Sequence, residues 1–205
     1  TNGSDGGGDP TRCIVIGRPG GVEQLRTITL KPGIVTCGYN YETQPFTKPI
    51  LSNSDVPEDS VVIKIEAFSV NFADCAIRWG LYESANAFVG WPICPGFDIA
   101  GVVERVGSNV KGSVSVGDRV FGCSLFGSYS TRVLVPALHL RKIPLDYAFI
   151  QAAAIPAVSL TSLYALFLAG HYPNKSQFTN KAILIHSAAG GVGSMLVQMS
   201  KILGL

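Results

Sequence analysis

The sequence feature that most constrains the fold is a cluster of small residues close to the C-terminal end of the chain. The segment from Ser187 to Ser194 reads SAAGGVGS, and a short apolar run, 182–185, comes directly before it. The residues from Met195 to Leu203 follow and predict a helix. A strand, a turn of small residues and a helix in this order are typical of a dinucleotide-binding turn. Small residues let backbone N–H groups reach a pyrophosphate at the helix N-terminus.

The turn departs from the usual dinucleotide fingerprint at one position. Read as G-x-G-x-x-G, it has Ala188, Gly190 and Gly193 at the three glycine positions, so alanine replaces the first glycine. Such a match is weak by itself, because a plain strand–turn–helix looks the same. Gly190 and Gly191 would let the backbone approach phosphate, and Gly193 would let the helix pack closely on the strand. We therefore predict that six residues of the turn contact the cofactor: Ala188, Ala189, Gly190, Gly191, Val192 and Gly193.

The position of this turn predicts an unusual domain organisation. Only 14 residues follow Gly191 in the sequence, whereas a doubly wound nucleotide domain needs roughly 100 residues or more beyond that point. We therefore expect the chain to hold the first phosphate-binding turn of such a domain and little else of it. The acidic residue that selects NAD lies about 20 residues past the turn, which is beyond the last residue, Leu205.

Composition argues against several classes of function. The net charge is +2 and no basic stripe is present, which argues against a nucleic-acid partner. The five cysteines are scattered without a C-x-x-C pair, so we expect small buried side chains in a reducing compartment rather than disulfides or a zinc knuckle. The chain has no run of 18 apolar residues, and we expect no transmembrane segment. Residues 1–11, rich in Gly, Asp and Ser, predict a disordered lead.

Short strands are predicted between this lead and residue 145. Residues from Val61 to Val70 alternate between apolar and polar, and further short runs are punctuated by Gly and Pro, which is typical of a partly open β-barrel. Gly101 interrupts one of these strands and predicts a bulge or a close backbone approach. The stretch from Lys31 to Ser60 is polar and predicts a long irregular loop.

Helices are predicted in two regions. Asn71 would cap a short helix from Phe72 to Trp79. Two further helices, Ala148–Ala154 and Ser159–Ala169, would be separated at Pro156.

Six fragments in this order resemble the medium-chain dehydrogenase/reductase superfamily, in particular its zinc-independent quinone oxidoreductase branch and the vesicle-protein relatives of that branch. These fragments are 70–74, VNFAD; 78–82, RWGLY; 95–103, PGFDIAGVV; 116–122, VGDRVFG; 160–164, LTSLY; and 188–193, AAGGVG. The resemblance runs from about residue 12 to the end of the chain. It implies a mixed β and α/β fold: a GroES-like, partly open β-barrel over 12–145, then linker helices and the first strand–turn–helix of a Rossmann doubly wound domain over 146–205.

The resemblance also implies an activity. Enzymes of this branch transfer hydride from NADPH to a quinone or an activated enone, so we expect a small hydrophobic carbonyl or quinone substrate in a cleft between the two domains. The cofactor carries the chemistry and the protein positions it. Relatives imply a homodimer for the full-length protein. We expect a cytoplasmic location, or an organelle after removal of a targeting segment.

The resemblance assigns roles to three side chains, and each has a plainer interpretation. Asn71 corresponds to an asparagine on the nicotinamide side of the site, yet it also suits a helix N-cap. Thr161 corresponds to a threonine that hydrogen-bonds the nicotinamide carboxamide, yet a helix hydroxyl also bonds back to the backbone. Tyr82 is a candidate catalytic proton donor or a packing aromatic. Many quinone oxidoreductases have a tyrosine five residues after the asparagine, where this chain has Ala76, so solvent could supply the proton.

The resemblance also implies that no zinc is bound. Zinc-dependent relatives use a Gly-His-Glu segment, and here that segment reads Gly96-Phe97-Asp98, in which phenylalanine cannot ligate a metal. His186 follows the predicted strand and is expected to be packed or to support another residue.

Three other functions stay open at this point. One is a truncated, catalytically inactive form that acts as a binding or interaction module through exposed apolar surface. The second is an enoyl-thioester reductase of the same superfamily, which would need a longer acyl channel and a tyrosine donor. The third is a lens- or vesicle-type relative whose enzyme activity is incidental.

Overall fold

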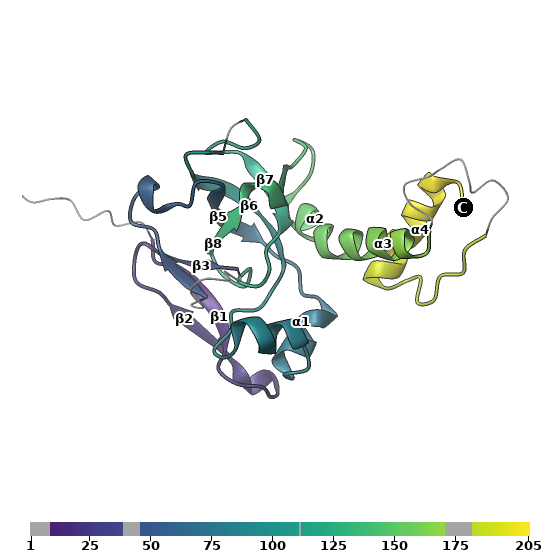
Figure 1. Ribbon diagram of the computed structural model, residues 1–205, viewed down its shortest axis with the longest axis horizontal. Helices are drawn as coiled ribbons and strands as arrows, with labels where there is room; N and C mark the ends of the chain where they lie inside the picture. Colours follow the sequence, from purple (N-terminus) through teal and green to yellow (C-terminus); the bar gives the residue numbers. More distant parts are fainter. Residues whose placement is uncertain (1–8, 39–45, 111, 171–181) are drawn as a thin grey trace, which may run out of the picture. The chain divides into compact units, whose positions relative to one another are not determined.

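The computed structural model describes residues 9–38, 46–110, 112–170 and 182–205. It divides into two compact units, Thr1–Ala153 and Ala154–Leu205 (Figure 1). Most of the predicted N-terminal lead, residues 1–8, lies outside the described residues, and Thr11 is already buried in the first unit.

A mixed sheet of short strands forms the first unit, as the punctuated strand pattern predicts (Figure 1). Its order is β4-β3-β8-β5-β6-β7-β9, and every neighbouring pair is antiparallel except β3 with β8. The strands are β3 (Ile34–Cys37), β4 (Thr47–Pro49), β5 (Ser60–Ala67), β6 (Asp98–Val106), β7 (Arg119–Cys123), β8 (Arg132–Pro136) and β9 (Leu140–Lys142). A separate antiparallel hairpin consists of β1 (Arg12–Ile16) and β2 (Leu25–Thr29).

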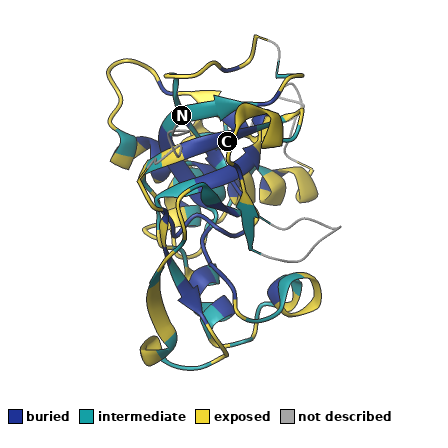
Figure 2. Ribbon diagram, turned by 90° about the vertical axis from the view of Figure 1, so that its left-hand side faces the viewer, coloured by how far each residue is buried: buried dark blue, intermediate teal, exposed yellow. Residues whose placement is uncertain are grey.

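The central strands hold the main hydrophobic core of this unit (Figure 2). Apolar side chains that alternate along β5, β6 and β8 point to one side, because successive strand residues face opposite sides of a sheet. The core residues on these strands are Val61, Ile63, Ile99, Val103, Val133 and Val135. The alternation of apolar residues over 61–65 therefore predicts correctly which face of β5 is turned toward this core.

The predicted irregular loop over Lys31–Ser60 is wrong in part, because it contains two strands. In β3, Val35 and Thr36 are buried, and Thr36 pairs with Val133 of β8. A strand of four residues is too short to show alternation against the surrounding Pro, Gly and Ser. Its place in the sheet comes from pairing with a strand about a hundred residues away in sequence, which no local pattern reveals. Part of the predicted loop, 39–45, lies outside the described residues.

Gly101 lies where the backbones of β6 and β5 approach each other closely, one of the two features that the sequence predicts there. It pairs with Ile65, next to a register shift between Ile65 and Ala67. A Cβ atom at residue 101 would lie 2.0 Å from the carbonyl oxygen of Lys64. The absence of a side chain is therefore required for this strand pairing.

The α-helices lie close to their predicted positions, but α3 and α4 both start earlier than predicted. They are α1 (Phe72–Arg78), α2 (Phe149–Ala153), α3 (Pro156–Leu168) and α4 (Gly191–Leu203), and the short helical turns are 22–24, 53–55, 85–89 and 137–139. Helix α3 begins at Pro156 rather than at Ser159, because proline in the first helical turn lacks only an N–H that would be unpaired there. Helix α2 packs on β5, β6 and β7 of the first unit, and Arg119 lies over the Phe149 ring at 4.6 Å.

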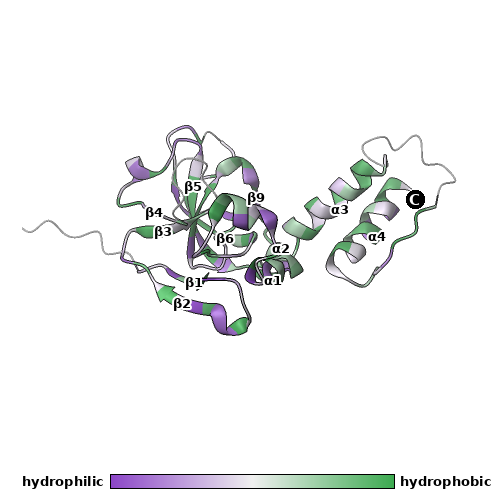
Figure 3. Ribbon diagram, turned by 60° about the horizontal axis from the view of Figure 1, so that its bottom comes forward, coloured by the Kyte–Doolittle hydropathy of each residue, from purple (hydrophilic) through white to green (hydrophobic). Residues whose placement is uncertain are grey.

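No segment of the sequence is expected to cross a membrane, but one stretch is long and apolar enough to do so by length and composition alone. This stretch is Phe149–Leu168, which has 20 residues and is interrupted between α2 and α3 (Figure 3). The expectation counted unbroken apolar residues, whereas this stretch includes Gln151 and Ser159. Ala152, Ala153 and Leu166 within it are buried in the protein, and a core helix of a soluble protein passes the same test.

Helices α3 and α4 form the second unit through contacts between small residues. A Cβ atom on Gly191 would lie 2.9 Å from Cγ1 of Val158. The Ser162 hydroxyl donates to the carbonyl oxygens of Val158 at 2.7 Å and Val192 at 3.0 Å. Close packing of α3 on α4 thus brings α3 against the first turn of α4.

The predicted strand over 182–185 is wrong, because this segment has no strand conformation. Leu184 is 82% exposed, and His186, expected to be packed, is exposed as well. A strand needs a neighbour to satisfy its backbone groups, and none of the described residues pairs with this segment. The apolar composition therefore distinguishes the segment that precedes the glycine turn, but it does not predict the conformation of that segment.

Candidate functional site

The turn before α4 leaves the N-terminus of the helix open to solvent. Ser187 has a positive φ of 53°, and its carbonyl oxygen accepts a hydrogen bond from the Gly190 N–H at 2.9 Å. Gly190 is the N-cap residue, so α4 starts at Gly191, one turn earlier than the predicted start at Met195. No side chain among the described residues caps the helix, and Gly190 and Gly191 are exposed.

Gly193 is the tightest point of this turn. It is buried, and a Cβ atom there would lie 2.2 Å from the carbonyl oxygen of Ser187 and 2.8 Å from Cα of Ala188. The glycine thus lets the turn fold back against the helix, whereas the sequence predicted that it would let the helix pack on a strand. An open helix N-terminus carries partial positive charge and unpaired N–H groups, so this turn fits the diphosphate of a dinucleotide.

In the first unit, Asn71 lies in a network of polar side chains at the start of α1. Its amide nitrogen Nδ2 donates to Ser69 Oγ at 2.9 Å and to Asp98 Oδ2 at 3.0 Å, and Ser69 also donates to Asp98. The backbone N–H of Asn71 donates to Asp74 Oδ2 at 2.8 Å. Asn71 is therefore the N-cap residue of the helix, and its amide is held toward a buried carboxylate.

Asp74 joins this network to the core. Its side chain is buried, and its Oδ2 accepts a hydrogen bond from the Tyr129 hydroxyl at 3.0 Å. Burial raises the pKa of Asp74, against the opposing effects of the Asn71 and Tyr129 hydrogen bonds. Burial, and then the nearby Asp98, raise the pKa of the Cys123 thiol to about 12. These groups make a second polar centre that the sequence indicated only through Asn71.

We expect Asp74 to make the stability of the folded chain depend on pH. A carboxyl group whose pKa is raised by folding contributes stability that is complete below its unfolded pKa, about 4, and is lost as pH rises through the folded pKa. Asp74→Asn keeps the side-chain shape and an acceptor oxygen without the charge. We therefore expect the Asp74 contribution to vanish from the unfolding free energy, measured by urea denaturation from acidic to neutral pH.

A matched control for this prediction is Asp118→Asn. Lys142 lies 2.7 Å from Asp118 and lowers the pKa of its carboxyl group, so the Asp118 contribution is lost as pH falls. The two variants should change the pH profile in opposite directions. Identical profiles for wild type and Asp74→Asn would contradict the prediction.

Tyr82 and Phe97 lie together in an aromatic cluster. The Tyr82 ring centroid is 5.8 Å from that of Phe97 and 6.2 Å from that of Phe126. Phe97 occupies the position of the metal-binding histidine in the motif, and here its ring packs against Phe126 at 5.4 Å. Among residues 9–38, 46–110, 112–170 and 182–205, no group of three or more His, Cys, Asp and Glu side chains is placed to hold a metal ion. The ring contacts with Phe97 and Phe126 show that Tyr82 packs in this cluster, whereas its catalytic role stays a prediction.

Thr161 is exposed on α3, and its hydroxyl donates to the carbonyl oxygen of Ala157 at 2.7 Å. This is the backbone bond that any helix threonine can make. Contact with a nicotinamide carboxamide therefore stays a prediction for this residue.

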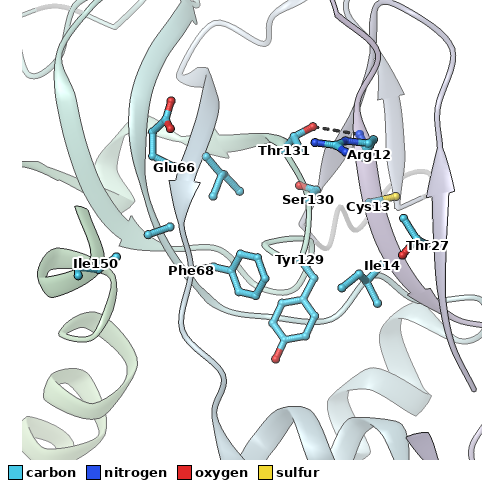
Figure 4. Close-up of a pocket in the computed structure, with 12 residues that line it drawn as sticks. Arg12, Cys13, Ile14, Thr27, Glu66, Phe68, Tyr129, Ser130, Thr131 and Ile150 are labelled. Carbon is cyan, nitrogen blue, oxygen red and sulfur yellow. Dashed lines mark hydrogen bonds between the residues drawn. The ribbon is translucent and has the colours of Figure 1, made fainter. Parts of the chain in front are cut away.

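A cavity in the first unit was not indicated by the sequence. It has a volume of about 540 Å³ and is lined by residues from β1, Thr27 of β2, the segment 65–68 at the end of β5, the segment 129–131 and Ile150 of α2 (Figure 4). The rings of Phe68 and Tyr129 lie in it with centroids 4.6 Å apart. Its walls come from five separate parts of the sequence, and none of them carries a recognisable motif.

The fold and the turn together define a class of protein. A GroES-like barrel is followed in sequence by a helix pair with an open glycine turn, the start of a Rossmann-type nucleotide domain. Residues 57–145 match the alcohol dehydrogenase GroES-like domain. The chain belongs to the medium-chain dehydrogenase/reductase superfamily, as its resemblance predicts.

Three known proteins illustrate this relationship. The 2-methylene-furan-3-one reductase of Solanum lycopersicum is 36% identical over 156 residues, which cover 72% of this chain and 38% of the reductase. The synaptic vesicle membrane protein VAT-1 homolog of Danio rerio is 34% identical over 155 residues, covering 75% of this chain and 29% of that protein. The structure of Escherichia coli quinone oxidoreductase with NADPH matches with a TM-score of 0.68 at 28% identity, covering 94% of this chain and 50% of that one.

The chain therefore spans between about a third and a half of these proteins. The matched portion includes the GroES-like domain and, in the structural match, extends over nearly the whole chain.

Proposed function

We propose that this chain forms the GroES-like domain and the first nucleotide-binding turn of an NADPH-dependent, zinc-independent oxidoreductase that reduces a quinone or an activated enone. The observation that carries the proposal is the uncapped N-terminus of α4, built on Gly190, Gly191 and Gly193. The names of the relatives support it, since they include a reductase and a quinone oxidoreductase whose structure holds NADPH. We further propose a cytoplasmic location and a homodimer for the whole protein.

Each part of the proposed site has a defined task. The N–H groups of the α4 first turn would bind the diphosphate, while Asn71 and Thr161 would orient the nicotinamide. NADPH, when bound, supplies the hydride. The network of Ser69 and Asp98 holds the Asn71 amide in one orientation, which reduces the entropy lost on binding. Tyr82 is the proposed proton donor, with solvent as the alternative source.

The turn can be tested with Gly190→Asp. Aspartate is a favourable N-cap residue, so its carboxylate would occupy the free N–H groups of α4 and repel a diphosphate. A Cβ atom at residue 190 meets only the Ser187 carbonyl oxygen, at 3.3 Å, so the fold should be kept. We expect NADPH affinity, measured by the fluorescence of the bound cofactor, to fall roughly tenfold or more, which corresponds to about 1.4 kcal/mol.

The matched control is Gly17→Asp in the first unit, where an added Cβ atom meets nothing within 4 Å. It introduces the same charge and should leave NADPH binding unchanged. Equal affinity of Gly190→Asp and wild type would contradict the proposed site. Turnover of NADPH with 1,2-naphthoquinone, 9,10-phenanthrenequinone or a simple enone then tests the reaction. Binding without turnover would favour an interaction module, and reduction of enoyl thioesters alone would favour an enoyl-thioester reductase.

A further inference from the structure

Two of the five cysteines lie against each other in the core of the first unit. Cys13 on β1 and Cys94, before β6, are both buried and share one hydrophobic cluster with Val15 and Tyr129. Cys13 is 2% exposed and Cys94 is fully buried. These two residues are far apart in sequence, and no sequence pattern pairs them.

The backbone holds the two cysteines in place from both sides. Ile16 and Ile93 exchange two backbone hydrogen bonds of 2.9 and 3.0 Å, which join β1 to the segment that carries Cys94. Ile14 donates from its N–H to the Tyr129 carbonyl oxygen at 2.8 Å, and the Cys94 thiol lies 3.6 Å from that same oxygen. Both cysteines therefore flank the backbone of Tyr129, on ordered segments of the unit.

The two cysteines differ in their relation to the cavity of about 540 Å³. Cys13 is one of its lining residues, together with Ile14 and Ser130, whereas Cys94 does not line it (Figure 4). A reagent in the cavity therefore lies against residue Cys13 and not against Cys94.

The pKa shifts of the two thiols indicate that Cys13 reacts before Cys94. The hydrogen bond between the two thiols lowers the pKa of Cys13, whereas burial raises that of Cys94 well above its usual value. Burial also raises the pKa of Cys37, to about 11. Because the thiolate is the attacking species in thiol–disulfide exchange, Cys13 is the better nucleophile of the pair.

We propose that Cys13 and Cys94 form a redox-modifiable dithiol, which a low-molecular-weight disulfide entering the cavity converts into an intramolecular disulfide. The Cys13 thiolate attacks the small disulfide, forming a mixed disulfide and releasing one small thiolate. The Cys94 thiol then loses its proton and attacks the Cys13 sulfur, releasing the second small thiolate. The protein loses two protons and two electrons, and the small disulfide takes them up and is reduced to two thiols.

The test is to treat the folded 205-residue chain with oxidised glutathione and to measure its intact mass after blocking free thiols. We expect a product that has lost two hydrogens and carries no glutathionyl group. Non-reducing proteolysis should recover Cys13 and Cys94 in one linked pair of peptides. In Cys94→Ala, Cys13 should instead retain one glutathionyl group, because the resolving thiol is missing. Circular dichroism would confirm that this variant folds.

The matched control is Cys37→Ala, which removes another thiol near Cys94 and should still form the bridge. Mapping of the bridge in native protein to another pair of cysteines would overturn the proposal. So would the absence of any bridge in the wild type. The wild-type mapping needs no variant, so it decides the question even if Cys94→Ala does not fold.

Discussion

Gly101→Ala is expected to lower the free energy of unfolding of the first unit by about 3 kcal/mol or more, or to prevent folding. A Cβ atom there would lie 2.0 Å from the Lys64 carbonyl oxygen and 2.9 Å from Cγ2 of Ile63. The first of these atoms belongs to the backbone of β5, so it cannot move without breaking the β5–β6 pairing around Ile65. Urea denaturation followed by tryptophan fluorescence measures the effect, because both tryptophans lie in this unit.

Gly17→Ala provides the comparison for this prediction. It lies just after β1, and an added Cβ atom would meet nothing within 4 Å. Its midpoint of unfolding should stay close to that of the wild type. A Gly101→Ala variant as stable as Gly17→Ala would mean that β5 and β6 are farther apart than described.

The second large effect is expected for Gly193→Ala, in the turn before α4. The added Cβ atom would lie 2.2 Å from the Ser187 carbonyl oxygen and 2.8 Å from Cα of Ala188. Both are backbone atoms, so the turn must move away from the helix. We expect a loss of about 2–3 kcal/mol in the stability of the second unit and a loss of NADPH binding. Hydrogen exchange of residues 187–200, followed by mass spectrometry, should show faster exchange in the variant.

Gly190→Ala is the matched control in the same turn. Its Cβ atom would meet only the Ser187 carbonyl oxygen, at 3.3 Å, a contact that a shift of a few tenths of an ångström relieves. Exchange in this variant should therefore stay close to that of the wild type. Equal exchange rates for Gly193→Ala and Gly190→Ala would contradict the close packing of the turn against α4.

The glycine turn before α4 and the polar network around Asn71 could be predicted from the sequence to different degrees. The glycine turn was visible in the sequence because its function depends on the absence of side chains at consecutive positions, which is a local property. The network around Asn71 was visible only at Asn71. The side chains of Ser69, Asp74, Asp98 and Tyr129 join it through hydrogen bonds that mostly link separate segments of the chain, and no local spacing encodes those bonds.

The same distinction explains the errors in the predicted elements. Residues 182–185 are apolar enough for a strand, but a strand also needs a paired neighbour, and none of the described residues supplies one. Conversely, β3 has little pattern of its own and exists because it pairs with β4 and β8. Strand formation is thus decided by pairing partners as much as by composition.

The sequence by itself determined the superfamily, the alternation of the central strands, the α-helices and the two glycines at which backbone must approach backbone. These features follow from short-range rules: side-chain periodicity, helix capping and the steric size of each residue. The tertiary structure alone decided which buried groups meet, including Asp74 with Tyr129 and Cys13 with Cys94. Such contacts join distant parts of the chain, so they depend on the register and packing of the whole unit rather than on any one segment.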